Sequence, residues 1–367
     1  MKALNERAEA ALATPQRMSR RSPGLFRVTW SHFRRSRFGI YGLVFVAILL
    51  AIGFFAPVLA NNQPVLCRYH GKIYAPAIVE FAWNIPFAKA LVKKSPPFNQ
   101  ATFDFKFEFA DAASRDPADW AWMPLIPFGP YDTSSRVLEP PGSEHWLGTD
   151  ETGRDLLARM IYGARVSLLV GFVSVGIATV IGIFFGALAG YFGGIVDILI
   201  SRFIEVMQCF PEFFLILSIV VWRPPSIWNV MIVIGFVRWT GIARFVRGEF
   251  MRQRDSEYAI AARALGAAAP RIVMHHLLPN SLAPVFVMVT FGIANAIILE
   301  GALSFLGFGV APPQASWGGI LKSAKDNLET TSHMMFPPCI AIFISVLSYN
   351  LVGDALRDAI DPRINRT

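Results

Sequence analysis

Long apolar segments constrain this chain more than any other feature of its sequence. The first runs from Phe38 to Ala60, and five more follow at about Val166–Tyr191, Ile198–Trp222, Ile227–Val246, Leu282–Phe308 and Phe336–Leu356. A helix rises about 1.5 Å per residue, so roughly 20 apolar residues cross a hydrocarbon core about 30 Å thick. Backbone polar groups have no water to bind in lipid, and segments of this length satisfy them as helices. The sequence therefore predicts an all-α membrane protein with six transmembrane helices.

The charge pattern supports this interpretation. Of the 367 residues, 54% are hydrophobic and only 16% are charged, whereas an average soluble domain has roughly 25% charged residues. The net charge of +8 does not point to nucleic acid, because the basic residues group around the ends of the apolar segments and no recognition motif accompanies them. Such grouping orients a membrane protein with its basic loops in the cytoplasm.

The first apolar segment has an alternative reading as a signal peptide, since Val58-Leu59-Ala60 could serve as a cleavage site. A long basic leader and a segment near spanning length favour an uncleaved helix. Six spans then place both termini in the cytoplasm. The expected regions are a cytoplasmic tail 1–37, the first helix 38–60, a periplasmic insertion and lead-in 61–163, a five-helix core 164–358 with a cytoplasmic loop 255–280, and a cytoplasmic tail 359–367.

The insertion mixes charges of both signs, is rich in proline and aromatic residues, and lacks a helical period. We expect a partly ordered extracytoplasmic segment that packs on the membrane domain. The second span carries glycines four residues apart, which places them on one helix face where another backbone can approach closely. The glycines of this predicted packing stripe are Gly182, Gly186, Gly190 and Gly194.

Charged residues inside spans are costly and therefore candidate functional residues. Glu212 and Arg238 each lie about ten residues from the outer turn between spans three and four, so we expect them near mid-membrane, where they pair or line the path of a transported solute. Glu300 lies near the outer end of span five, and Arg202 and Glu205 have the i,i+3 spacing of a surface pair. For these three, gating or structural ion pairing is favoured over substrate contact.

No catalytic or metal-binding pattern is present. The three cysteines are far apart, the histidines have no zinc-ligand spacing, and no G-x-x-x-x-G-K-[ST] phosphate loop occurs. The chain is therefore not expected to be an enzyme or to hold a cofactor or metal. Any energy for transport must come from an ion gradient or from a partner.

The stretch AARALGAAAPRIVMHHLLPN, residues 261–280, lies between spans four and five. Asp255 or Ser256 can cap a helix, Gly266 is suited to its C-terminal stop, and Pro270 suits the first turn of a second helix that ends before Pro279. This pattern predicts a compact hairpin of two short helices. By these features alone it could be a simple connector or a unit that fits a groove in another protein.

The same stretch resembles the EAA coupling loop of ABC importer permeases. Ile260 stands where that motif has glutamate, a departure that resembles the peptide-importer branch. The remaining chain is similar to dipeptide/oligopeptide permeases through HWLGTDETGRDLLARMIYGARVSL, GYFGGIVD, ARFVRGE, LEGALSFLGFG, SWGGIL and NLVGDALRDAIDPR. The long insertion before Pro140 is similar to that of permeases for microcin C and short peptides. The positions identified with the coupling loop are Ala261, Ala262, Arg263, Gly266, Leu278 and Pro279.

The resemblance implies a type I ABC importer permease with six transmembrane helices and an extracytoplasmic insertion, located in the bacterial inner membrane. Its implied partners are a homologous second permease, ATP-binding-cassette ATPase subunits that bind ATP and magnesium, a periplasmic peptide-binding protein and the lipid bilayer. The implied cargo is a peptide or peptide-like compound; nickel or opine-like solutes are alternatives. A secondary transporter, a membrane-embedded enzyme and a structural scaffold are less favoured, because no convincing repeat or catalytic signature is present and a scaffold would not explain the motifs.

Overall fold

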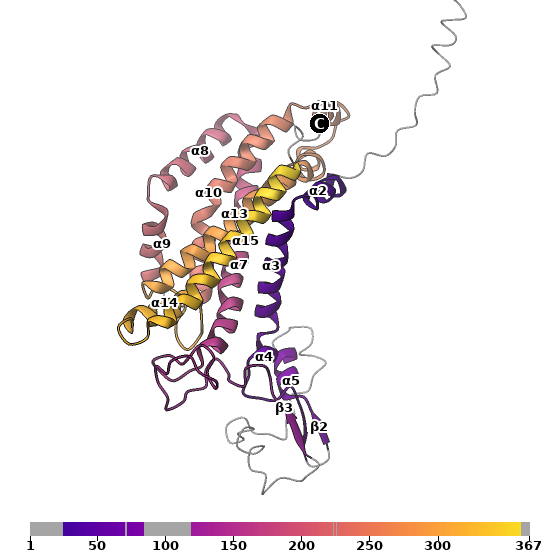
Figure 1. The fold of residues 1–367 in the computed structure, drawn as a ribbon. Coiled ribbons are helices and arrows are strands. Elements are labelled where there is room, and N and C mark those ends of the chain that lie inside the picture. The colour runs from indigo at the N-terminus through magenta and orange to yellow at the C-terminus, as the bar shows by residue number, and fades with distance from the viewer. Residues whose placement is uncertain (1–24, 70–71, 84–118, 223, 225, 361–367) are drawn as a thin grey trace, which may run out of the picture.

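The computed structural model describes residues 25–69, 72–83, 119–222, 224 and 226–360, and it is a helical bundle with a small appended domain at one end (Figure 1). Five helical stretches are long and apolar enough to span a membrane. They contain α3 (Arg37–Phe54), α7 (Leu156–Phe192), α10 (Ile227–Arg254), α13 (Leu278–Phe305) and α15 (Phe336–Ile360). The all-α membrane core predicted from the sequence is confirmed.

The expected span Ile198–Trp222 is not one straight helix, because that segment is broken into two helices. α8 (Gly194–Gln208) and α9 (Glu212–Val221) pass the spanning criteria only together, and they meet at an angle of 80°. The break coincides with Pro211, which precedes α9. Proline cannot donate a backbone hydrogen bond, and it disfavours helical geometry at the residue before it. By length and composition, the described residues therefore contain five candidate spans, or six if the bent pair counts as one.

The longest helix, α7, begins eight residues before the expected boundary at 164. Asp155 caps its first turn by accepting a hydrogen bond from Ala158 N–H at 2.7 Å. At the other end of the bundle, α2 (Leu25–Phe33) occupies part of the expected N-terminal tail. Phe33 packs against Ala355 and Ala359 of α15. Residues 1–24 and 361–367 of the two expected tails lie outside the described residues.

α7 and α10 form the closest helix pair of the core, and the glycines of α7 explain why. A Cβ atom added at Gly186 would lie 2.6 Å from Ala243 O, and one at Gly190 would lie 2.6 Å from Arg247 O. A Cβ atom added at Gly182 would lie 2.7 Å from Ile242 Cβ and 3.0 Å from Trp239 O. The prediction that Gly194 shares this contact needs correction: it follows the helix break at Gly193, has a φ of +54°, and faces no atom within 4 Å.

The insertion carries strands that the sequence did not reveal. β1 (Leu66–Tyr69) pairs with β2 (Lys72–Tyr74) and with β3 (Trp120–Trp122) in an antiparallel sheet of order β2-β1-β3. The short helix α4 (Ala56–Leu59) connects α3 to this sheet, and α5 (Pro76–Trp83) follows β2. Strands of three or four residues are too short for an alternating pattern to stand out. Residues 84–118, the middle of the insertion, lie outside the described part of the chain.

Candidate functional site

The hairpin between α10 and α13 lies at the end of the bundle that carries α2, opposite the insertion (Figure 1). Its first arm is α11 (Glu257–Ala264), and Gly266 follows with a φ of +79°. Ala267 N–H donates to Ala262 O at 3.0 Å and Gly266 N–H donates to Arg263 O at 2.9 Å. This pair of bonds is the Schellman motif, which needs a left-handed residue that glycine supplies without strain.

One face of the hairpin is fixed to the bundle, and the other is exposed. Ala259, Ile272 and Leu277 are fully buried in a cluster that includes Val246 and Phe250 of α10. Apolar side chains exposed on a rigid projection are typical of a protein–protein contact. The exposed apolar side chains here are Tyr258, Ile260, Leu265 and Met274.

The six residues identified with the coupling loop are divided between the face that packs on the bundle and the exposed face. Ala262 and Leu278 are half-buried, whereas the remaining four are exposed. The Arg263 guanidinium donates to Arg254 O, which ties the first arm to the end of α10. The exposed positions are Ala261, Arg263, Gly266 and Pro279.

The second arm does not end before Pro279, as the sequence analysis expected. α12 (Ala269–Ile272) continues through the π-helix η2 (Val273–Leu277) directly into α13. Leu278 N–H donates to Val273 O five residues back. Pro279 has no N–H to donate and its ring would clash with the carbonyl four residues earlier in an α-helix, so a π turn accommodates it. The second arm of the hairpin is therefore continuous with a helix of the bundle.

Polar contacts join α10 to the broken pair α8 and α9. The Arg238 Nε lies 2.8 Å from Glu212 Oε1, so the pairing considered from the sequence is present. Arg247 Nη2 donates to Asp197 Oδ2 at 2.7 Å. These contacts form a polar ladder, which we define as Glu212–Arg238, Gln208–Arg244 and Asp197–Arg247.

Much of this polar ladder is exposed. The Glu212 and Arg238 side chains are 47% and 22% exposed. Ionised groups facing lipid are costly, so this face of α10 suits a water-filled path or another chain better than lipid. Arg202 and Glu205 of α8 also form the predicted i,i+3 pair, with 2.6 Å between Arg202 Nη1 and Glu205 Oε2. Both are largely exposed, and such pairs contribute little to stability.

Glu300 makes no ion pair among the described residues, so of the two roles favoured from the sequence only gating stays a prediction. It is 1% exposed, and it accepts hydrogen bonds from Ser304 Oγ at 2.7 Å and from Ser167 Oγ at 3.1 Å. Ser316, which caps α14 (Trp317–Asp326), lies 3.4 Å from Ser304 Oγ. The carboxyl group thus links α7, α13 and α14 through hydroxyl groups.

A second buried polar network, for which the sequence analysis assigned no roles, holds the segment before α7. Asp150 is fully buried and accepts from Arg154 Nε at 2.8 Å, from Thr152 Oγ1 at 2.8 Å and from Arg159. Burial acts to raise the pKa of Asp150, but the Arg159 charge and the hydrogen bonds from Arg154 and Thr152 outweigh it, so the pKa lies below its ordinary value. The i,i+4 spacing of Asp150 and Arg154 is the signal that could have revealed this pair.

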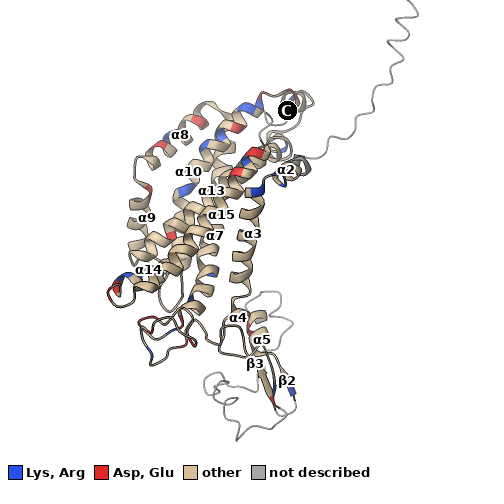
Figure 2. Cartoon of the chain, viewed as in Figure 1, with Lys and Arg blue, Asp and Glu red and all other residues tan. Residues whose placement is uncertain are grey.

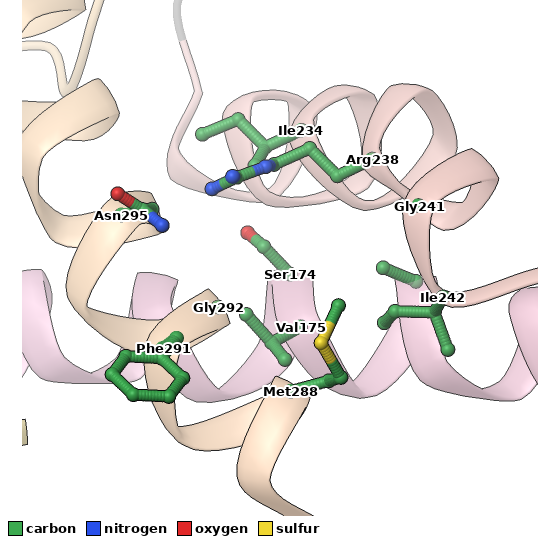
Figure 3. A pocket seen from close by; sticks show the side chains of 11 residues that line it. Ser174, Val175, Ile234, Arg238, Gly241, Ile242, Met288, Phe291, Gly292 and Asn295 are labelled. Atoms are coloured by element: carbon green, nitrogen blue, oxygen red, sulfur yellow. The ribbon is translucent and has the colours of Figure 1, made fainter. Parts of the chain in front are cut away.

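A cavity of about 140 Å³ lies beside the polar ladder, between α7, α10 and α13 (Figure 3). Most of its lining is apolar, with Ile234, Met288 and Phe291 among the larger side chains. Its polar lining consists of Ser174, Arg238 and Asn295, one from each helix. A pocket that is mostly apolar with a few convergent polar groups is typical of a small-ligand site.

Comparisons with known proteins agree with this architecture. Residues 24–76 match the family described as the N-terminal TM domain of oligopeptide transport permease C. Residues 182–366, half of the chain, match the binding-protein-dependent transport system inner membrane component.

Relatives from three bacteria show how far the similarity extends. The dipeptide transport system permease protein DppC of Alkalihalophilus pseudofirmus is 40% identical over 245 residues, which cover 66% of this chain and 81% of that protein. The inner membrane ABC transporter permease protein YejE of Escherichia coli is 32% identical over 354 residues, covering 94% and 99%. The peptidoglycan transport system permease protein YejE of Agrobacterium fabrum is 31% identical over 359 residues, covering 91% and 92%. Coverage this high means that the two YejE alignments include the insertion.

Proposed function

This chain belongs to the family of binding-protein-dependent transport system inner membrane components, and from that premise we propose that it is the permease subunit of an importer of peptides or peptide-like compounds. The names of its relatives support this cargo, since they refer to dipeptide and peptidoglycan transport. They favour peptides over nickel or opine-like solutes. The YejE relatives share the insertion, and on that ground we assign this chain to the microcin C and short-peptide type of permease.

Partner subunits would supply the energy. The chain has no phosphate-binding loop in its sequence, so ATP and magnesium would be held by ATPase subunits. The observation that carries the proposal is the hairpin, which exposes Leu265 on one side and continues into α13 on the other. ATPase subunits that bind this exposed face and approach each other would shift α13. That shift would change the side of the membrane from which a solute can enter the bundle.

The other proposed partners follow from the two remaining surfaces. The exposed polar ladder suits a path shared with a homologous second permease, because both chains would exclude lipid from it. The insertion lies at the opposite end from the hairpin (Figure 1), where a periplasmic binding protein would deliver its cargo. Basic residues gather at the hairpin end of α10 and at α2 (Figure 2), which supports a cytoplasmic location of that end and of both termini.

ATP hydrolysis by the assembled complex tests the proposal. The chain is co-purified with its second permease and ATPase subunits, reconstituted, and assayed with and without peptide-loaded binding protein. Binding protein should stimulate hydrolysis, and Gly266→Val should abolish the stimulation while the complex still assembles. Gly248→Val on α10 serves as a control, because Gly248 also faces no atom within 4 Å but has no positive φ. Failure to associate with an ATPase, or uptake driven by an ion gradient, would contradict the proposal.

A further inference from the structure

The cavity between α7, α10 and α13 brings together polar groups that can all donate hydrogen bonds. The guanidinium of Arg238, the hydroxyl of Ser174 and the carboxamide of Asn295 point toward one another in Figure 3. Among the described residues that line it, Arg238 is the one with a charge. A cation flanked by a hydroxyl and an amide N–H₂ is a donor set for an anion.

Ser174 gives independent support for a ligand site in this cavity. Its side chain is completely buried, yet its Oγ has no hydrogen-bond partner among the described residues. An unpartnered buried hydroxyl is costly, and on a helix it could bond to its own backbone. Instead the hydroxyl is directed into the cavity beside Arg238 (Figure 3). The Ser174 hydroxyl is therefore a donor that no described group uses.

Arg238 is only partly used by its partner. The ion pair with Glu212 employs Nε at 2.8 Å, and the end of the guanidinium that carries the η nitrogens extends toward Asn295 (Figure 3). A guanidinium presents five N–H donors in a planar fork that matches a carboxylate. A second carboxylate can therefore bind the free side of Arg238, or displace Glu212 from it.

We propose that this cavity binds the free C-terminal carboxylate of a peptide, with Arg238, Ser174 and Asn295 as its ligands. The inference rests on the proposed transport of peptides and assigns one subsite on that route. The apolar wall formed by Met288, Phe291 and Ile234 then receives the side chain of the last residue. A volume of about 140 Å³ is well below the roughly 300–1,000 Å³ of pockets for drug-sized ligands, so only the end of the peptide enters.

Glu212 acts in this arrangement as an internal competitor. Its carboxylate holds Arg238 when no peptide is present, which keeps the cation paired. Removal of the Glu212 charge should therefore strengthen peptide binding, whereas removal of the Arg238 charge should weaken it. Opposite effects from the two halves of one ion pair cannot be explained by a loss of folding.

Binding to the purified complex of this chain, its second permease and its ATPase subunits tests the subsite without the binding protein. Equilibrium dialysis measures radiolabelled tri-alanine against tri-alanine amide, whose C-terminus is neutral. In the wild type the amide should bind about ten-fold or more weakly than the acid, as expected for loss of a charge-assisted hydrogen bond. Arg238→Gln and Ser174→Ala should lower affinity for the acid, and Glu212→Gln should raise it. Arg165→Gln, which removes an exposed charge of α7 outside the cavity, should change nothing.

The wild-type comparison of acid with amide needs no variant, so it remains decisive if a variant fails to fold. Equal binding of the two probes, or no saturable binding of the acid, would overturn the subsite. A carboxylate from the second permease could instead occupy it; then the probes bind equally and Arg238→Gln disrupts assembly. Uptake of tri-alanine with binding protein, measured in parallel, distinguishes failure of the proposed subsite from failure of the proposed transport function. If uptake occurs but the purified complex binds the acid and the amide equally, only the subsite is refuted. If no uptake occurs, the transport function is refuted.

Discussion

Substitution of Gly186 by alanine tests the packing of α7 on α10 most directly. The added Cβ would lie 2.6 Å from the Ala243 carbonyl oxygen and 2.8 Å from Val246 Cβ. The first of these neighbours is backbone and cannot rotate away. Since a carbon–oxygen contact needs about 3.3 Å, the two helices must separate locally by about 0.7 Å.

The cost follows from the contacts that such a separation loosens. A gap of about 0.5–1 Å forfeits a quarter to a half of each dispersion contact, and overpacked core sites lose about 1–3 kcal/mol. Alanine regains about 1 kcal/mol of helix propensity over glycine, so the net loss should reach at most about 2 kcal/mol. Gly176, on the same helix, faces no atom within 4 Å and has no positive φ. Gly176→Ala should therefore stabilise by up to about 1 kcal/mol.

The assay is unfolding of the purified chain in mixed micelles, followed by the fluorescence of its nine tryptophans. The two variants should shift the free energy of unfolding in opposite directions. Gly182→Ala and Gly190→Ala should follow Gly186→Ala, because each meets α10 backbone or Cβ atoms at 3.0 Å or less. If Gly186→Ala and Gly176→Ala change stability equally, close backbone approach does not hold this helix pair together.

The remaining predictions concern the buried networks and the hairpin. Asp150→Asn leaves two nearly buried guanidinium groups without their shared carboxylate and should cost about 3–5 kcal/mol in the same unfolding assay. Folding lowers the pKa of Asp150, so the contribution of Asp150 to the free energy of unfolding is present above its ordinary pKa of roughly 3.9. This contribution is lost as the pH falls through the lowered pKa. If the unfolding of Asp150→Asn depends on pH as strongly as that of the wild type, this expectation is refuted. Glu300→Gln keeps one of the two acceptor oxygens and replaces the other with an amide N–H₂ that can donate to a hydroxyl oxygen. It should therefore cost less than Glu300→Ala, which leaves buried hydroxyls unpartnered at about 1–3 kcal/mol each; equal unfolding free energies would contradict the hydroxyl linkage. The Leu265 side chain is 88% exposed, so Leu265→Glu should leave the free energy of unfolding unchanged. It should nevertheless abolish the stimulation of ATP hydrolysis by binding protein. Full stimulation in this variant would exclude Leu265 from the ATPase contact.

Features that depend on neighbours along the chain were predictable. The apolar segments predicted where α3, α7, α10, α13 and α15 lie, because helix length and lipid thickness are matched locally. The glycine at the end of α11 and three of the four glycines of the predicted packing stripe were also identified from spacing alone. Gly194 was misplaced because the helix ends at Phe192, two residues before it, where a regular period no longer applies.

Features that depend on partners distant in the sequence appeared only in the folded chain. Ser167 lies 133 residues before Glu300, so nothing near Glu300 shows that hydroxyl groups rather than a cation surround it. The bend at Pro211 and the continuity of the hairpin with α13 are choices between local geometries that packing decides. The sequence by itself determined a membrane bundle with a basic hairpin between two of its helices, because burial in lipid leaves few alternatives to helices. Only the tertiary structure decided that Arg238, Ser174 and Asn295 share one cavity, because three helices must pack before their faces meet.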